Sequence, residues 1–203
     1  MELYVFRHGE TDWNKIKRLQ GSTDIDLNEN GIELAKVTAN AVKDIHFDYA
    51  FSSPLIRACH TGSIILGDRD IKLNTDDRLK EMNFGEDEGK MPEERSEGFS
   101  RFFEKPGEYI PSPGGETIEE LCERTKNFVE EVLIPLSIKE PDCRVVVFGH
   151  GAMNKSIHLY LTGKSKKDLW AGQFPKNCCV NIYTINGYKF ELLEEAKIYY
   201  NLQ

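Results

Sequence analysis

Short apolar runs separated by amphipathic stretches recur along most of the chain. Residues 3–9 (LYVFRHG) and 48–53 (DYAFSS) are largely apolar until each ends at small or polar residues, which predicts two strands. Residues 27–45, between them, have the composition of a helix. The next segment, 53–67, begins as helices do, with Ser53 as a candidate N-cap and a proline at the first helical position.

The clearest helical pattern covers residues 117–134. Apolar side chains recur there at helical spacing, and charged residues occupy the opposite face. Thr117 and Glu120 have the spacing of a capping box at the start of this helix. Pro135 should end or kink it, because proline lacks the backbone N–H that a helix interior needs.

The last third of the chain continues the alternation. Residues 144–151 (RVVVFGHG) predict a buried strand, and residues 152–163 predict a helix closed by the glycine at its end. Residues 180–193 predict a hairpin around Asn186-Gly187.

Between about residues 68 and 113 the chain becomes acidic and is punctuated by glycine and proline, without a strand pattern. We interpret residues 83–114 as a short helical insertion that lies over the main fold. The remaining alternation of strands and helices predicts an α/β protein with three layers, in which a mostly parallel central sheet has helices on both faces. The length predicts a single domain over residues 1–203.

Three of the predicted strand ends carry chemically reactive side chains. They are Arg7-His8, Ser52 to Arg57, and Gly149-His150-Gly151. Sites in α/β sheets gather at the carboxyl ends of the strands, so we expect His8 and His150 to meet in one crevice with the two arginines. Such a crevice would be a cationic pocket.

Residues 149–156 (GHGAMNKS) raise a different possibility, because their offsets are those of a P-loop. Asn154 stands where the second glycine should be, and the dinucleotide pattern G-x-G-x-x-G fails at the same residue. That glycine lets backbone amides approach the phosphate, so the motif loses its physical basis. We interpret Lys155-Ser156 as the solvated first turn of a helix.

The composition is that of an ordinary soluble protein, with 39% hydrophobic and 30% charged residues. The formal net charge of −8 argues against nucleic acid as a partner and provides no basic patch for a membrane. It also opposes phosphate binding, so a phosphate site must be a local concentration of cations. No segment approaches the roughly 18 apolar residues of a membrane span. The acidic surface predicts neither a monomer nor an oligomer.

The five cysteines form no C-x-x-C motif, which predicts neither a disulfide framework nor a zinc site. The adjacent Cys178 and Cys179 are expected to be buried thiols on a strand. The N-terminus, MELYVFRHGE, is charged too early to be a signal peptide. The reducing cytoplasm is therefore the expected location.

The two His-Gly strand ends belong to a set of six sequence blocks. They are RHGETDWN at 7–14, QGSTDIDLNENG at 20–31, SSPLIRACHTG at 52–62, RLKEMNFGEDEG at 78–89, PGGET at 113–117 and GHG at 149–151. Their identity and order resemble the histidine phosphatase (phosphoglycerate mutase-like) superfamily over nearly the whole chain. The resemblance implies that family's α/β fold, with the insertion covering an active site.

The resemblance also implies roles for individual residues. His8 would be the nucleophile that forms a phosphohistidine, and Glu81 would be the proton donor. Arg7, Arg57 and His150 would hold the phosphoryl oxygens. Further substrate contacts would come from Asn14, Gln20, Gly21 and Gly151.

The chemistry of phosphoryl transfer supports these roles independently. Its transition state spreads charge over the equatorial oxygens, so positioning and electrostatics dominate. A cation 4 Å from that charge contributes about 4 kcal/mol at an effective dielectric near 20. Several such contacts replace a metal ion, so we expect neither a metal nor another cofactor. His8 must be neutral to attack, and neighbouring arginines favour that state.

A carboxylic acid must protonate the leaving alkoxide and later accept a proton from the attacking water. Glu86, Asp87 and Glu88 follow Glu81 closely, and only the resemblance selects Glu81 among them. If another of these carboxylates faced the pocket, only the acid would change.

The family contains both phosphatases and cofactor-dependent phosphoglycerate mutases. The mutases carry a longer, basic segment after the acid, whereas residues 83–114 are short and acidic here, with their cations scattered. Such a segment would meet a carboxylate-bearing substrate poorly. We therefore expect a metal-independent phosphatase that acts on small phosphomonoesters. A phosphoglycerate mutase and a non-catalytic phosphate-binding protein are the alternatives.

The aromatic residues of the insertion have two interpretations. They are Phe99, Phe102, Phe103 and Tyr109. They would form an apolar wall for a larger, nucleoside-like alcohol, as in the α-ribazole phosphatases that this chain also resembles, or they would anchor the insertion to the core.

Overall fold

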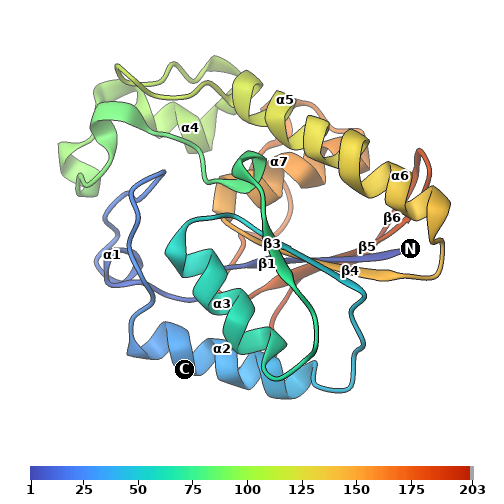
Figure 1. Ribbon diagram of the computed structural model, residues 1–203. Helices are drawn as coiled ribbons and strands as arrows, with labels where there is room; N and C mark the ends of the chain where they lie inside the picture. Colours follow the sequence, from blue (N-terminus) through green and yellow to red (C-terminus); the bar gives the residue numbers. More distant parts are fainter. Residues whose placement is uncertain (202–203) are drawn as a thin grey trace.

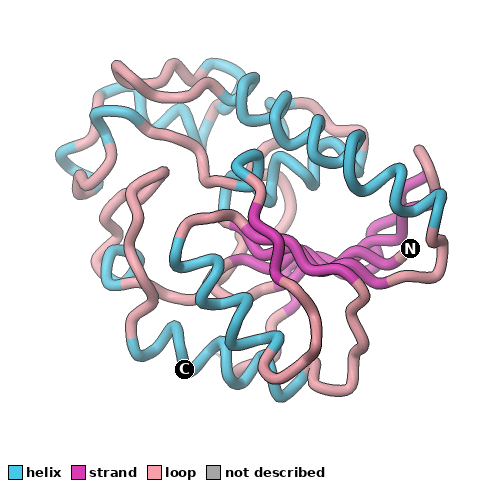
Figure 2. The backbone as a smooth tube through the Cα atoms, viewed as in Figure 1, coloured by secondary structure: helices cyan, strands magenta, loops and turns pink. Residues whose placement is uncertain are grey.

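A six-stranded sheet lies between two layers of helices in the computed structural model, which describes residues 1–201 (Figures 1 and 2). The strand order is β3-β2-β4-β1-β5-β6. The strands are β1 (Glu2–Arg7), β2 (Tyr49–Ser52), β3 (Leu73–Thr75), β4 (Arg144–Gly149), β5 (Val180–Asn186) and β6 (Lys189–Lys197). The predicted α/β fold with helices on both faces is confirmed.

Five of the six strands run in the same direction, and β5 alone runs opposite to them. β1 and β2 each pair in parallel with β4, and β2 also pairs in parallel with β3. β5 is antiparallel to both β1 and β6. β5 and β6 form the predicted hairpin, which turns at Gly187 and Tyr188. In the register of β1 with β4, Arg7 lies opposite Gly149, so the residues that follow each strand emerge side by side.

The helices divide between the two faces of the sheet (Figure 1). α2 and α3 cover one face, and α5, α6 and α7 cover the other. The helices are α1 (Asp12–Lys15), α2 (Glu29–Ala41), α3 (Ile56–Leu66), α4 (Ser100–Glu104), α5 (Ile118–Phe128), α6 (Ile134–Lys139) and α7 (Gly151–Thr162). Alternate residues of β1 supply the two cores: Leu3 and Val5 pack toward α5 to α7, and Tyr4 and Phe6 pack toward α2 and α3.

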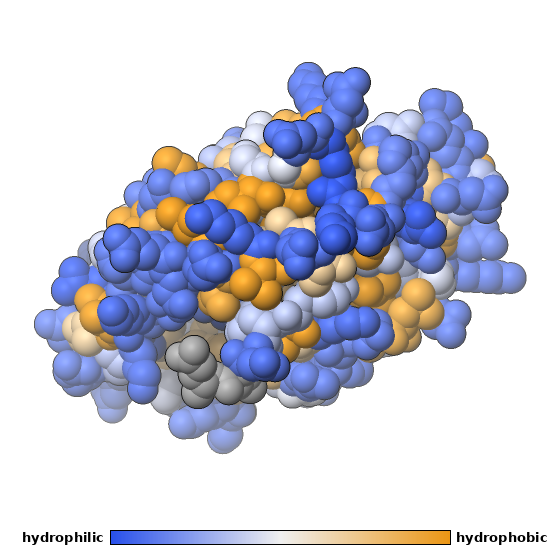
Figure 3. All heavy atoms as spheres, turned by 90° about the horizontal axis from the view of Figure 1, so that it is seen from below, coloured by the Kyte–Doolittle hydropathy of each residue, from blue (hydrophilic) through white to orange (hydrophobic). Residues whose placement is uncertain are grey.

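Figure 3 shows the molecule from below the view of Figure 1, the side on which α2 and α3 lie. Hydrophilic side chains cover most of this face, and hydrophobic atoms gather across its middle. The buried residues of α2 are Gly31, Ala35 and Thr38, which recur at steps of four and three. α2 therefore turns one narrow stripe to the sheet and its charged residues to solvent.

The helix predicted over 117–134 begins as expected but does not end at Pro135. Thr117 and Glu120 form the predicted capping box. A π-helical segment, Val129–Leu133, connects α5 to α6, and the chain stays helical to Lys139. Of the two outcomes predicted at Pro135, an end or a kink, the end was wrong, and the helix is instead locally altered to a π-helical segment before the proline. The wider π turn stands directly before the proline, where the ring would otherwise crowd a carbonyl of the preceding turn.

The start of α3 was predicted too early. Leu55, and not Ser53, is the N-cap, and Ser53 accepts a hydrogen bond from the Leu55 amide through its Oγ. The Ser53 amide still donates to the Phe148 carbonyl of β4, at 2.9 Å. The chain is thus held in the sheet at Ser53 and turns into the helix only afterwards.

The segment 68–113 contains one strand that its sequence did not indicate. β3 has three residues and pairs only with β2, at the edge of the sheet, so it leaves too short a pattern to recognise. The predicted insertion, 83–114, consists of α4 and short 3₁₀ turns. Those turns are Gly85–Asp87, Pro92–Glu94, Glu97–Phe99 and Pro106–Glu108.

The expectation of a solvated turn at Lys155-Ser156 was wrong. Only 3% of Lys155 and 1% of Ser156 are exposed, because α7 packs under α5 and against the sheet. The same helix ends as predicted, with Gly163 in the left-handed conformation. Cys178 and Cys179 are buried as expected, but they lie in a turn before β5 and not within the strand.

Candidate active site

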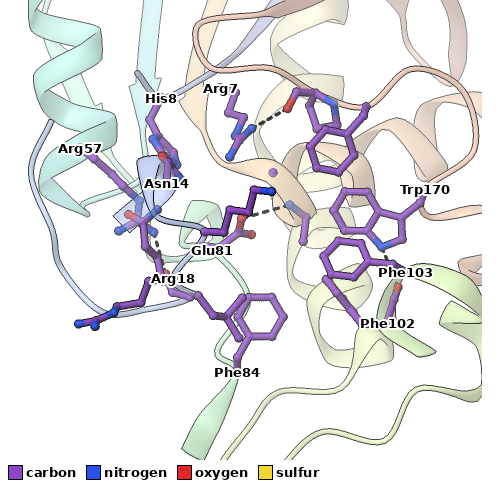
Figure 4. Close-up of a pocket in the computed structure, with 18 of the residues that line it drawn as sticks. Arg7, His8, Asn14, Arg18, Arg57, Glu81, Phe84, Phe102, Phe103 and Trp170 are labelled. Atoms are coloured by element: carbon purple, nitrogen blue, oxygen red, sulfur yellow. Dashed lines mark hydrogen bonds between the residues drawn. The ribbon is translucent and has the colours of Figure 1, made fainter. Parts of the chain in front are cut away.

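Three strand ends that are distant in sequence meet at one edge of the sheet. His8 follows β1 and His150 follows β4, and the His8 amide donates to the Gly149 carbonyl at 2.9 Å. The centroids of the two imidazole rings lie 5.2 Å apart. Arg57 reaches the same place from the first turn of α3, beyond the end of β2 (Figure 4). The predicted meeting of His8 and His150 is confirmed.

His8 is held in one protonation state by its own backbone. Its Nδ1 lies 2.6 Å from the Gly9 carbonyl, and a carbonyl only accepts, so Nδ1 carries the ring proton. The lone pair of the neutral ring is therefore on Nε2. Burial lowers the pKa of His8 well below its ordinary value, and the charges of Arg57 and Arg7 lower it further. His8 is a neutral imidazole with one nitrogen available for nucleophilic attack.

His150 is fully buried and carries two unsatisfied ring nitrogens. Neither nitrogen has a hydrogen-bond partner within residues 1–201. Burial lowers the pKa of His150 well below its ordinary value, and the charge of Arg57 lowers it further. A buried polar group without a partner is costly, so the ring is suited to donate a hydrogen bond to a bound molecule.

Arg57 is fully buried, and two backbone carbonyls orient its guanidinium in the site. Nη1 donates to Thr23 at 2.8 Å, and Nη2 donates to Gly21 at 2.7 Å. Burial lowers its pKa to about 10, which still leaves the group charged at neutral pH. The carbonyls that orient it belong to a loop fixed by Glu88, whose carboxylate accepts from the amides and hydroxyls of Ser22 and Thr23.

Arg7 lies at the end of β1 and bridges toward the opposite wall of the site. Its Nη1 donates to the Pro175 carbonyl at 2.6 Å. Its Nε is buried and finds no acceptor in the described part of the chain. Arg7 and Arg57 thus place two cations beside the two histidines, and the predicted cationic pocket is present in an acidic protein.

Glu81 lies between the histidines and the insertion and faces the pocket (Figure 4). Its Oε1 accepts from the Met82 and Met153 amides at 2.9 and 3.0 Å, and its Oε2 accepts from the Ala152 amide at 3.1 Å. The N-terminus of α7 therefore fixes this carboxylate. Glu88 is instead occupied by the 22–23 loop, so Glu81 is the carboxylate that lines the pocket.

The remaining expected contacts also line this pocket. They are Asn14, Gln20, Gly21 and Gly151. Asn14 accepts from the Thr11 amide and from Asn177 through Oδ1, and Gln20 accepts from the Thr11 hydroxyl. Gly21 has a φ of +58°, and a Cβ there would lie 2.0 Å from Glu88 Oε1, so this turn requires glycine.

Five aromatic side chains line the pocket, and we call them the aromatic wall. They are Phe84, Phe102, Phe103, Trp170 and Phe174. Phe84, Phe102 and Phe103 come from the insertion, whereas Trp170 and Phe174 come from the loop after α7. Figure 4 labels four of these five residues, all except Phe174. Phe99 and Tyr109 are buried against Phe102 and do not line the pocket. Phe102 and Phe103 therefore line the pocket, Phe99 and Tyr109 anchor the insertion to the core, and contact between the pocket rings and a substrate stays a prediction.

Several pocket residues had no signal in the sequence. Trp170, Phe174 and Pro175 follow a helix in an unremarkable loop, and only the fold brings them near β1. Lys17, Arg18 and Arg95 also line the pocket, the last from the insertion. Although the cations of the insertion are scattered in sequence, the fold brings Arg95 to the pocket.

No group of three or more histidine, cysteine or acidic side chains within residues 1–201 is arranged to hold a metal ion. In the same range, no helix is both long and apolar enough to cross a membrane.

The fold and the site together define a class of protein: an α/β protein with histidines and arginines converging at the carboxyl ends of parallel strands. The chain belongs to the histidine phosphatase superfamily (branch 1), whose family model matches residues 3–197.

Curated relatives within this family have different activities. The chain is 35% identical over 180 residues to a protein named uncharacterized phosphatase PhoE from Bacillus subtilis (strain 168), covering 88% of this chain and 86% of the relative. It is 31% identical to phosphoserine phosphatase 1 of Hydrogenobacter thermophilus, covering 84% and 81%. It is also 31% identical to a 2,3-bisphosphoglycerate-dependent phosphoglycerate mutase of Parvibaculum lavamentivorans, covering 83% of each.

Solved structures share the whole architecture. Bacillus stearothermophilus YhfR superposes with a TM-score of 0.88 at 27% identity, covering 97% of each chain. A putative alpha-ribazole-5'-P phosphatase from Escherichia coli superposes with a TM-score of 0.83 at 26% identity, covering 98% of each.

Proposed function

We propose that this protein is a phosphatase that hydrolyses small phosphomonoesters through a phosphohistidine at His8. The observation that carries the proposal is the state of the His8 ring. The Gly9 carbonyl holds the proton on Nδ1, and burial with two arginines keeps the ring neutral, which leaves Nε2 as a nucleophile.

In the first step, Nε2 of His8 attacks phosphorus and the bond from phosphorus to the ester oxygen breaks. The leaving alkoxide takes a proton from the Glu81 carboxyl group. In the second step, water attacks the phosphohistidine while the Glu81 carboxylate accepts its proton, and inorganic phosphate and free His8 result. The hydrogen bonds from the α7 amides keep Glu81 in place for both steps.

The charge on the transferring group would be met by Arg7, Arg57 and His150. The Nε of Arg7 and both ring nitrogens of His150 are buried without partners in the described chain, so each has a hydrogen-bonding atom to offer. Preorganised donors of this kind stabilise charge that develops over the phosphoryl oxygens.

The aromatic wall would receive the alcohol part of the substrate. Ring centroids of neighbouring wall residues lie 5.0 to 5.6 Å apart, from Phe102–Phe103 to Trp170–Phe174. Such a surface favours a flat or apolar alcohol, since aromatic contacts contribute beyond the area they bury.

A phosphoglycerate mutase is the second candidate function. Lys17, Arg18 and Arg95 line the pocket, and cations there would suit a substrate with a second acidic group. Arg95 is partly engaged, because its Nη2 donates to the Lys17 carbonyl and its guanidinium lies 5.0 Å from the Phe99 ring, while its Nε has no partner in the described chain. We favour the phosphatase because five aromatic side chains line the same pocket and suit an apolar alcohol better than a second acidic group.

Phosphorus NMR tests the proposal directly. The protein is incubated in excess EDTA with 3-phosphoglycerate, an aryl phosphate or α-ribazole phosphate, with His8→Ala alongside and His46→Ala as an exposed-histidine control. We expect inorganic phosphate from at least one ester with the wild type and with His46→Ala, and none with His8→Ala. Formation of 2-phosphoglycerate in place of inorganic phosphate would identify a mutase. Equal turnover by His8→Ala would refute the proposed nucleophile.

A further inference from the structure

An ion pair between a buried lysine and a partly exposed glutamate lies beside the aromatic wall. Lys155, in the first half of α7, reaches with its Nζ to the loop that follows the helix. Nζ donates to the Ala171 carbonyl at 2.8 Å and lies 3.4 Å from Oε1 of Glu195 on β6. The exposed fraction of the side chain is 3% for Lys155 and 23% for Glu195.

Glu195 holds the same loop at a second point. Its Oε1 accepts from the Gln173 amide at 3.1 Å. Gly172, between the two contacts, has a φ of +80°, and a Cβ there would lie 2.3 Å from Glu195 Oε1. The loop backbone can therefore approach the carboxylate closely only because this residue is glycine.

The loop held in this way, residues 170–175, carries much of the pocket, and we call it the wall loop. Trp170 and Phe174 are stacked at 5.6 Å with an angle of 22° between their rings, and both belong to the aromatic wall. Pro175, at the end of the wall loop, accepts the hydrogen bond from Arg7. The two contacts of the ion pair, at Ala171 and Gln173, fall between Trp170 and Phe174 in the chain.

The burial of a lysine needs an explanation, because an ammonium group is costly to remove from water unless it is paired and hydrogen-bonded. A methionine would fill similar space without that cost. The contacts that offset it all go to the wall loop or to Glu195, which holds the wall loop. A lysine serving only the core would have no reason to bond there.

We propose that Lys155 and Glu195 are positioning residues that set the preference for the alcohol part of the substrate by holding the wall loop. Neither residue touches the substrate. They act through Trp170 and Phe174, so their effect depends on how much of the alcohol reaches the aromatic wall. The inference rests on the proposed phosphatase activity for its kinetic test, and a second test is independent of that activity.

The kinetic test compares 1-naphthyl phosphate, which reaches the aromatic wall, with glycerol phosphate, which is small and polar. In Lys155→Met we expect the ratio of kcat/KM for the two esters to fall about tenfold, which corresponds to about 1.4 kcal/mol. The loss should appear in KM for the naphthyl ester. Lys155→Arg should restore most of the ratio, because it keeps the charge and the donors. Lys164→Met, an exposed lysine on the same side, is the matched control and should leave the ratio unchanged. An equal loss for both esters, or no loss, would show that Lys155 is merely structural.

Tryptophan fluorescence provides the independent test. The chain has two tryptophans, so a Trp13→Phe background reports Trp170 alone. We expect acrylamide to quench Trp170 more strongly in Lys155→Met than in Lys155→Arg or Lys164→Met. Unchanged quenching would overturn the proposal even if the kinetics changed. Increased quenching in a protein that hydrolyses no ester would retain the positioning role and reject the phosphatase.

If Lys155→Met does not fold, Gly172→Ala is the variant to use in both tests. It leaves both charges in place and instead forces the wall loop away from Glu195. We expect the same fall in the naphthyl preference and the same rise in quenching, and the absence of both would contradict the proposal.

Discussion

The imidazole rings of His8 and His150 lie 5.2 Å apart, although 142 positions separate them in the chain. The parallel register of β1 and β4 produces this contact, because Arg7 pairs with Gly149 and each histidine is the next residue. Both rings are buried beside two arginines. Their closeness has consequences for stability as well as for chemistry.

The two histidines should make the protein less stable in acid. Their folded-state pKa values are lowered from 6.5, so below pH 6.5 the unfolded chain takes up protons that the folded chain refuses. The free energy of unfolding should therefore fall as the pH drops through 6.5, by up to about 1.4 kcal/mol per pH unit for each histidine. Urea unfolding at several pH values measures this slope. His150→Asn should lower it and His46→Asn should not; a wild-type slope in His150→Asn would contradict the pKa argument.

Glu81→Gln should separate the two proposed roles of this residue. Glutamine accepts the α7 amides through one oxygen but cannot donate a proton to an alkoxide. We expect kcat for an alkyl phosphate to fall by about 10² to 10⁴. For 4-nitrophenyl phosphate, whose leaving group needs no proton, the phosphorylation of His8 should be nearly unaffected, and single-turnover release of nitrophenolate measures it. A comparable loss for both esters in that step would reject Glu81 as the acid.

Glu88 should matter through Arg57 and not through proton transfer. Its carboxylate accepts from Ser22, Thr23 and Phe84, and the loop it fixes supplies the carbonyls that orient Arg57. In Glu88→Gln, one of the two accepting oxygens is replaced by an NH₂ group, so some of these donors lose their acceptor. This loss should lower the free energy of unfolding by about 1 to 3 kcal/mol. Weaker inhibition by inorganic phosphate should accompany it. Glu86→Gln, an exposed neighbour, is the control, and unchanged phosphate inhibition in Glu88→Gln would refute the link.

Substitutions at Phe103 and Phe99 should distinguish a residue that lines the pocket from one that anchors the insertion to the core. Phe103 is 40% exposed and lines the pocket, whereas Phe99 is 3% exposed and packs behind it. Phe103→Ala should reduce the preference for aryl over alkyl phosphates with little change in Tm. Phe99→Ala should lower the free energy of unfolding by about 3 to 5 kcal/mol, as for other buried phenylalanines. It should leave the preference for aryl over alkyl phosphates unchanged. The reverse pattern would assign the wall to Phe99.

The sequence by itself determined the alternation of strands and helices and the residues at the ends of β1, β2 and β4. These follow from local patterns, since apolar runs, a capping box and glycine turns act over a few residues. Glu81 could be named only because its sequence block resembles a family, as three other acidic residues stand nearby. The helix through Pro135 and the edge strand β3 were missed because a π turn and a three-residue pairing leave no such pattern.

Only the tertiary structure decided what surrounds the histidines. Lys155 looked like the solvated start of a helix, yet it is buried because α7 is covered by α5 and its ammonium finds partners on the wall loop and β6. Trp170 and Phe174 complete a wall begun by Phe102 and Phe103 of the insertion. Partners of this kind are distant in sequence, and their contacts depend on how the layers pack, which local periodicity does not encode.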